Sequence, residues 1–137
     1  TVQRVNRMIY KASATLRVYS DTRSLEDLSA KLGMVSEGGH SRGDSVGRRG
    51  TTRSESMWSI ERIAAGGSCV AHCLHALLDV ARHVIDEGLD HDMKADVFLG
   101  VFSDNDQLNL DISADLCAGF SALDLDLLIS GYVSSAD

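Results

Sequence analysis

Residues 12–20, ASATLRVYS, alternate between apolar and polar side chains. The apolar members occupy every second position: Ala12, Ala14, Leu16 and Val18. Successive side chains of a β-strand point to opposite faces of a sheet, so a period of two predicts a strand with one buried face. The stretch therefore predicts a sheet that is covered on one side.

Two helices are expected further along the chain. The segment 24–33, SLEDLSAKLG, has Ser24 and Asp27 at capping-box spacing, leucines at helical spacing and Gly33 in place to end the helix. The longest helix is expected over 68–88, where apolar residues recur along one face. Its opposite side carries His72, His75, Asp79, His83 and Asp86.

Further strands are expected over 56–63, 94–103, 107–113 and 123–130, with a hairpin through the turn at 104–106. A short helix from Ser113, with Leu116 and Phe120 facing inward, precedes the last strand. This order predicts an α+β fold, a two-layer sandwich in which helices pack on one face of a largely antiparallel sheet. We expect a loosely ordered segment over 1–11 and a single domain over 12–137, with a long Gly/Arg-rich loop at 36–56.

The uncovered face of such a sheet would be polar and mostly acidic. In LDLDLLIS, residues 123–130, leucines alternate with aspartates, so the two kinds of side chain would point to opposite faces. The alternation assigns Leu123, Leu125, Leu127 and Ile129 to the covered side. The residues expected on the open side are Arg17, Asp96, Asn109, Asp111, Asp124 and Asp126.

Charge is unevenly distributed along the 137 residues, whose net charge is −7. Residues 1–63 carry eleven basic and seven acidic side chains, whereas residues 64–137 carry two basic and thirteen acidic ones. The acidic total argues against general nucleic-acid binding, which draws much of its affinity from cations that neutralise phosphates. No apolar run approaches the roughly 20 residues that cross a bilayer, and no signal peptide is recognisable, so we expect no membrane association and a cytoplasmic location.

The segment 38–50, GGHSRGDSVGRRG, concentrates glycine and arginine. Glycines allow backbone amides to approach a ligand closely, and an arginine fork matches phosphate or carboxylate. The pattern is not a P-loop, because no lysine follows glycines at that motif's spacing. Two interpretations remain open: an anion- or partner-binding loop, or a solvated loop that pairs with the acidic half of the chain. The candidate anion-binding residues are Arg42, Arg48, Arg49 and Arg53.

The candidate metal and catalytic residues also have simpler structural roles. Cys69, His72, Cys73 and His75 resemble a metal cluster, but a closed zinc site needs four ligands that usually come from two segments. We therefore expect the histidines on the solvated face of the long helix, the cysteines reduced, and no metal or other cofactor. No strand-turn-helix nucleophile elbow occurs, so no catalytic residue is assigned. Whether the chain has enzymatic activity stays open.

The order of these motifs resembles the bacterial and phage family of the domain of unknown function 4279. The resemblance rests on ASATLRVYS, LEDLSAKLG, Gly43-Asp44 with arginines downstream, WSIE at 58–61, the long helix and LNLDISADLCAGFSALDLDL. It covers nearly everything after residue 11, and one departure is Leu128, where an aromatic residue is expected. The resemblance implies a small α+β domain and carries over neither an established activity nor catalytic residues.

A protein partner is the interaction that the separated charges favour, because complementary charge raises association rate and selectivity. The hypothesis is a non-enzymatic binding module, in the form of an inhibitor or immunity-type protein that blocks a bacterial or phage effector. Its predicted contact residues are Asp96, Asp111, Asp124 and Asp126. The alternative is a domain or enzyme that binds a phosphate- or carboxylate-bearing small molecule with the arginine-rich loop. A homodimer, in which that loop meets the acidic face of a second copy, is a third possibility.

Overall fold

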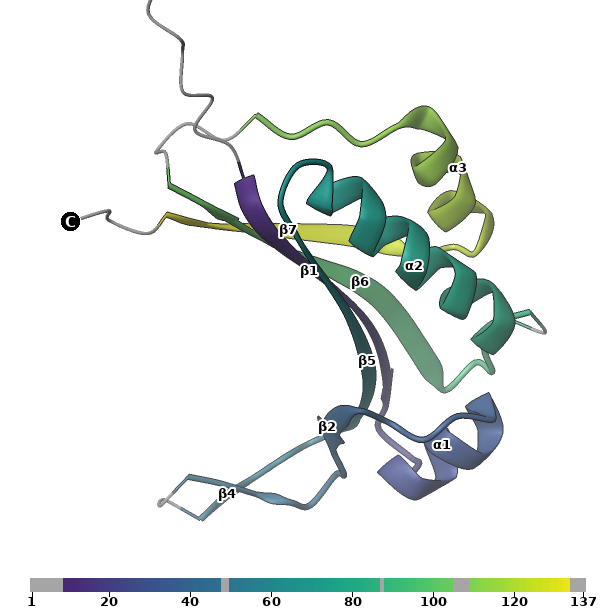
Figure 1. The fold of residues 1–137 in the computed structure, drawn as a ribbon. Helices are drawn as coiled ribbons and strands as arrows, with labels where there is room; N and C mark the ends of the chain where they lie inside the picture. The colour runs from purple at the N-terminus through teal and green to yellow at the C-terminus, as the bar shows by residue number, and fades with distance from the viewer. Residues whose placement is uncertain (1–8, 48–49, 87, 105–108, 134–137) are drawn as a thin grey trace, which may run out of the picture.

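The computed structural model describes residues 9–47, 50–86, 88–104 and 109–133. In this part of the chain a mostly antiparallel five-stranded sheet packs against three helices, so the predicted α+β class is confirmed. The sheet bends, and the helices lie on its outer side while its concave side is left open (Figure 1). This arrangement is the two-layer sandwich that the order of strands and helices predicts, and the alternation in 12–20 correctly predicts that one face of β1 is buried.

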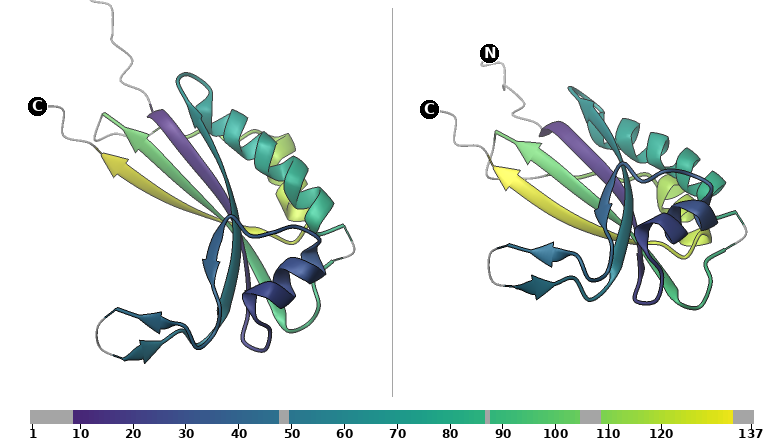
Figure 2. Two further views of the ribbon diagram at one scale, coloured as in Figure 1. Left: turned by 60° about the horizontal axis from the view of Figure 1, so that its bottom comes forward. Right: turned by 90° about the horizontal axis from the view of Figure 1, so that it is seen from below.

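The sheet order is β2-β5-β1-β6-β7. The strand β1 (Ile9–Ser20) is central and pairs antiparallel with β5 (Ser56–Ala65) and β6 (Met93–Ser103). The short β2 (Gly38–His40) pairs with the start of β5, and β7 (Asp126–Val133) runs parallel to β6 at the opposite edge. A separate two-stranded ribbon, β3 (Ser45–Val46) and β4 (Thr51–Thr52), projects away from the two layers (Figure 2). We call residues 41–55 the arm.

Alternate residues of β1 form the centre of the core. Ala12, Ala14, Leu16 and Val18 are all fully buried. Leu16 lies opposite Ile60 on β5 and Val97 on β6, and these neighbours are almost fully buried too. Directly opposed residues of an antiparallel pair share a face, so the register extends the apolar layer over three strands.

The helices cover this apolar layer. The helix α1 (Leu25–Leu32) begins with the predicted capping box of Ser24 and Asp27, and Gly33 ends it with a positive φ of 72°. The helix α2 (Cys69–Val84) buries one face against β1 and β5, and α3 (Ala114–Ala122) packs beside it. Leu116 and Phe120 face inward as predicted.

The expected hairpin between 94–103 and 107–113 is wrong for its described part. Residues 109–113 form no strand, and β6 pairs in parallel with β7 instead. Parallel neighbours need a long crossover connection, which contains α3 here. The alternation in this stretch has another cause, because Leu110 and Ile112 pack against the core from the connecting segment. Residues 105–108 lie outside the described residues.

Three segment boundaries also differ from expectation. The first strand begins at Ile9, so residues 9–11, which we expected in a loose end, are part of the central strand; residues 1–8 lie outside the described residues. The loop at 36–56 contains β2 and the ribbon of the arm. The last strand begins only at Asp126, since Asp124 occupies a left-handed turn with φ of 57°. The alternation predicted over 123–130 therefore holds as a strand pattern only from Asp126, with Leu127 and Ile129 on the helix side, and Ile129 is half exposed.

Candidate functional site

The concave side of the sheet, here called the open face, is not covered by the helices (Figure 1). It consists of Lys11, Ser13, Thr15, Arg17 and Tyr19 of β1 with the residues opposite them on the neighbouring strands. The exposed fraction of these β1 side chains is intermediate, in contrast to their fully buried neighbours. A row of polar and aromatic side chains therefore lines the hollow of the sheet.

An arginine and a carboxylate occupy the middle of the open face. The Arg17 Nε and Nη2 groups donate to the two Asp96 carboxylate oxygens at 2.7 and 3.0 Å, which is a bidentate pair. The same guanidinium lies over the rings of Phe98 and Tyr19, 5.0 and 5.7 Å from their centroids. The hydrogen bonds to Asp96 raise the pKa of Arg17, while burial raises the pKa of the Tyr19 phenol. Asp96 is thus a paired carboxylate and not a free acid.

A second cation–aromatic group lies toward one end of the open face. The Lys11 ammonium is 5.1 Å from the ring centroid of Phe102. Phe102 stacks on Tyr132 of β7 with centroids 4.9 Å apart. Tyr132 is 45% exposed, and Ile63, opposite Ser13 on β5, is 59% exposed. Apolar and cationic surface is therefore available to a partner beside the Arg17–Asp96 pair.

The predicted acidic face is largely absent from the sheet. Asp96 and Asp126 lie opposite each other on β6 and β7, but Asp96 is paired with Arg17. Asp124 is in the turn after α3, and Asp111 is in the irregular segment before it. Asn109 lies in that segment as well. The prediction fails because it assigned both segments to strands, which would have turned every second residue toward the open side.

Two of the predicted aspartates border the same pocket. Asp124 and Asp126 line a shallow hollow of about 210 Å³ between α3 and β7, together with Cys117 and Phe120. Both residues thus lie near the β7 edge of the sheet, and Asp126 is opposite Asp96 of the open face. Asp111 and Asp96 are not among its lining residues.

The arm holds the described part of the predicted basic loop. Its base is closed by Gly43 N–H donating to the Arg53 carbonyl and Arg53 N–H donating to the Asp44 carbonyl, each at 2.8 Å. Arg42 N–H donates to Ser56 Oγ, which joins the arm to β5. The side chains of Arg42 and Arg53 are exposed near this base, while Arg48 and Arg49 lie outside the described residues.

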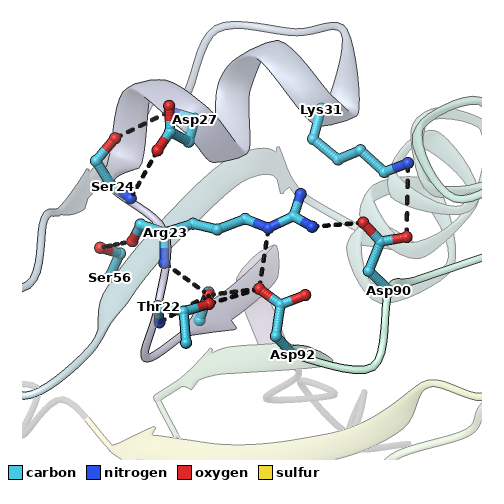
Figure 3. A network of polar contacts seen from close by, with 9 residues as sticks. Thr22, Arg23, Ser24, Asp27, Lys31, Ser56, Asp90 and Asp92 are labelled. Atoms are coloured by element: carbon cyan, nitrogen blue, oxygen red, sulfur yellow. Dashed lines mark hydrogen bonds and ion pairs between the residues drawn. The ribbon is translucent and has the colours of Figure 1, made fainter.

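A network of ion pairs that sequence reasoning missed fixes the end of the sheet from which the arm leaves (Figure 3). Arg23 donates to Asp90 at 2.6 Å and to Asp92 at 2.9 Å, and Lys31 approaches Asp90 from α1. Hydrogen bonds from Thr22 and Arg23 lower the pKa of Asp92 to about 2. No sequence motif indicates these contacts, because they join residues 59 to 70 positions apart.

The residues of the candidate metal cluster lie on opposite sides of α2. Cys69 and Cys73 are almost fully buried in the core, whereas His72 and His75 are exposed on the other side of α2. Burial raises the pKa of both thiols, that of Cys73 to about 11. In the described part of the chain, no three His, Cys, Asp or Glu side chains gather closely enough to hold a metal ion. Of the Asp104 to Asp106 turn, only Asp104 is described.

The comparisons with known proteins assign a family and no activity. The family model for the domain of unknown function DUF4279 matches residues 9–134. Neither the curated proteins nor the solved structures gave a match to this sequence. None of the helices in the described ranges combines the length and apolar character needed to span a membrane.

Proposed function

This chain belongs to the DUF4279 family, and we propose that it is a non-enzymatic module that binds another protein through its open face. The observation that carries the proposal is the one-sided covering of the sheet. The helices bury one face, and the concave face presents half-buried aromatic rings, cations and exposed apolar side chains. Aromatic and arginine side chains are enriched in protein interfaces, where they supply a large share of the binding energy.

The charges beside the open face define the chemistry of the partner. Arg42 and Arg53 stand at the edge of the sheet near β2, and Asp124 and Asp126 stand at the β7 edge. A protein surface with acidic groups opposite the arm, apolar groups opposite Ile63 and basic groups opposite the β7 edge would be complementary to this pattern. Such complementarity raises the association rate and rejects other partners.

An inhibitor or immunity-type protein is the specific form of this proposal. A small rigid domain can block an effector by occupying the surface that the effector uses for its own substrate. The acidic β7 edge would then lie against a basic groove, in line with the role expected for Asp126 and Asp124. We keep a cytoplasmic location as part of the proposal, and fractionation of host cells would test it.

The environments of the reactive side chains support a binding role over catalysis. The Cys69 and Cys73 thiols lie in the core with raised pKa values, so burial opposes formation of the nucleophilic thiolate. Asp92 is held as a carboxylate by Thr22 and Arg23, and a base with a pKa of about 2 is a weak proton acceptor. These groups therefore act as structural elements.

The experiment that tests the proposal compares two charge insertions of the same kind. A partner captured from the native host would be purified and its affinity measured for Ile63→Glu and for Val35→Glu. Ile63 is 59% exposed on the open face, and Val35 is 81% exposed in the segment between α1 and β2. We expect Ile63→Glu to weaken binding about tenfold or more and Val35→Glu to leave it unchanged. Equal affinity of Ile63→Glu and the native protein would refute binding at the open face.

The charge requirement is tested separately with the same partner. The variants Asp124→Asn/Asp126→Asn and Arg42→Ala/Arg53→Ala each remove charge from one edge of the sheet. We expect both to lower affinity and to flatten its dependence on salt, because exposed charges are screened. A complex that both variants leave unchanged in affinity and salt dependence would rule out charge complementarity.

One observation favours the alternative, a small anionic ligand at the arm. Arg42 and Arg53 stand close to the closed base of the arm, and no described carboxylate forms an ion pair with either. A thermal-shift screen with nucleotides and inorganic phosphate would test it, since a ligand that binds the native state raises Tm. A rise in Tm that Arg53→Ala abolishes would support the alternative.

A further inference from the structure

The strand β7 is an exposed sheet edge with apolar side chains on both of its faces. Its eight residues pair with β6 on one side, and no other described strand pairs with it. Leu128 and Tyr132 on the open face are 44 and 45% exposed, and Ile129 and Val133 on the helix side are 49 and 51% exposed. The strand contains no proline or lysine, and its single charge is Asp126 at its start. An edge of this kind readily pairs with another strand.

The opposite edge of the sheet is protected. The three residues of β2 cover the beginning of β5, and the arm follows β2. Further along β5, the Glu37 carboxylate accepts the Glu61 backbone N–H at 2.6 Å, and Arg62 pairs with Glu37 at 3.2 Å. A side chain thus occupies a backbone donor that an incoming strand would need. The contrast makes β7 the more available edge.

We propose that β7 pairs antiparallel with β7 of a second copy, around a twofold axis at Ser130. The two five-stranded sheets would then form one continuous sheet with both open faces on the same side. A twofold interface is self-complementary, so one strand must offer both halves of each contact. The inference uses the β7 edge to which the proposed function also assigns Asp126, but it is tested on the isolated chain, without a partner.

The order of side chains in β7 selects this register. The twofold axis is perpendicular to the sheet, so each open-face residue of one copy must lie opposite an open-face residue of the other copy. This holds only if the axis lies at a residue position, where that residue faces its own equivalent, and not between two positions. With Ser130 at the axis, Leu128 lies opposite Tyr132 of the second copy, and Leu127 lies opposite its Val133. Aromatic and branched apolar pairs of this kind stabilise adjacent strands. With the axis at Ile129, Asp126 would instead lie opposite Tyr132.

Electrostatic repulsion between the two acidic chains is small at this seam. In the Ser130 register, Asp126 is four residues from the axis in each copy, so the two Asp126 residues are eight residues apart along the seam. At a rise of about 3.3 Å per residue, the two carboxylates are roughly 26 Å apart. That distance is well beyond the Debye length of about 8 Å at physiological salt, so their repulsion is screened. The net charge of −7 per chain therefore allows an apolar seam.

Sedimentation velocity over a dilution series tests the association. The native chain of 14.7 kDa should approach twice that mass as its concentration rises. Leu128→Lys should raise the Kd of the dimer about tenfold or more, because two symmetric pairs lose their apolar contact. The matched control is Ile63→Lys, which introduces the same charge at the other side of the same face and should leave the Kd unchanged.

A second variant tests the register through rescue. Leu128→Lys and Tyr132→Glu should each weaken the dimer when introduced alone. In the double variant Leu128→Lys/Tyr132→Glu, the two introduced charges have opposite signs and face each other across the seam, so the dimer should strengthen relative to either single variant. A double variant weaker than both single ones would overturn the pairing of positions 128 and 132.

Disulfide trapping locates the axis directly. In a Cys117→Ser background, Ser130→Cys would place two thiols on directly opposed residues, whose Cα atoms are about 4.5 to 5.5 Å apart and within disulfide reach. Mild oxidation should give a covalent dimer with Ser130→Cys and none with Leu128→Cys, whose two thiols would be about four residues apart. Trapping through Ile129→Cys in place of Ser130→Cys would overturn the register.

The remaining outcomes are also decisive. The apolar seam should persist at high salt, whereas a dimer held by the arm and the acidic edge would dissociate. A chain that stays monomeric at every concentration, a dimer that dissociates in salt, or a dimer indifferent to Leu128→Lys would each overturn the proposal. If a peptide from another protein is the true occupant of this edge, the isolated chain will be monomeric.

Discussion

Replacing Gly39 by alanine should detach β2 from the sheet and leave the core folded. Gly39 has a φ of 111°, and a Cβ built there would lie 1.9 Å from the backbone oxygen of Met57. Non-bonded heavy atoms prefer separations of about 3.5 Å, so β2 would have to move by about 1.5 Å. That displacement breaks hydrogen bonds whose usual length is near 3 Å.

The size of the effect is limited by what β2 contributes. It forms three residue pairs with β5, and a backbone hydrogen bond is worth about 1 kcal/mol net. Detachment therefore lowers the free energy of unfolding by at most about 3 kcal/mol, because the strand can separate instead of straining the core. Hydrogen exchange measured by mass spectrometry should show faster exchange over residues 36–47 and unchanged exchange over α2. Denaturant unfolding gives the loss in stability.

The matched control is Gly43→Ala. Gly43 also has a positive φ, 87°, but a Cβ there would meet no atom within 4 Å. It should cost only the left-handed backbone penalty of about 1 kcal/mol and leave the protection of β2 intact. If both variants lose the same stability and β2 stays equally protected from exchange in both, a Cβ at position 39 does not detach β2 through a clash with Met57, and the prediction is wrong.

Three further outcomes are expected. The pKa of Asp92 is lowered to about 2 from 3.8, so the stability that the carboxylate provides is complete above pH 4 and is lost as the pH falls through 2. The variant Asp92→Asn should lack this pH-dependent loss in acid unfolding. The same loss of stability with falling pH in the native protein and the variant would contradict the prediction. Trp58→Phe removes a fully buried indole and the hydrogen bond from its Nε1 to the Met34 carbonyl. Denaturant unfolding followed by circular dichroism should show that the free energy of unfolding falls by about 2 kcal/mol. An unchanged free energy of unfolding would contradict the buried hydrogen bond. Cys117 is exposed, whereas Cys73 is buried and its pKa is raised to about 11. A thiol reagent at mild alkaline pH should therefore label one cysteine in the native protein and all three after denaturation. Rapid labelling of Cys73 in the native protein would contradict its burial.

The sequence predicted those parts of the fold that short-range patterns determine. The alternation around Leu16, the capping box at Ser24 and the apolar face of the long helix each express one local rule, and each is confirmed. The hairpin after β6 was wrong because Leu110 and Ile112 alternate like a strand while packing as a connection. An apolar–polar alternation indicates which side chains are buried, but it does not indicate which strand the backbone pairs with.

The candidate site was less predictable, because its contacts join distant segments. Arg17 and Asp96 were both assigned to the open face, but their pairing follows from the register of β1 with β6, which no local motif encodes. The contact of Arg23 with Asp92 could not be predicted for the same reason, because it also joins distant segments of the chain. Asp111 and Asp124 were misplaced because they were assigned to strands that the structure does not contain there.

The measurement that most directly tests the one-sided covering of the sheet is NMR of the aromatic rings with a soluble paramagnetic agent. Such an agent broadens the signals of side chains that it can approach. Tyr132 on the open face is 45% exposed, whereas Trp58 and Phe120 on the helix side are 0 and 3% exposed. The structure predicts strong broadening for Tyr132 and its stacked neighbour Phe102, with Trp58 and Phe120 unaffected. Equal protection of all four rings would contradict an open binding face.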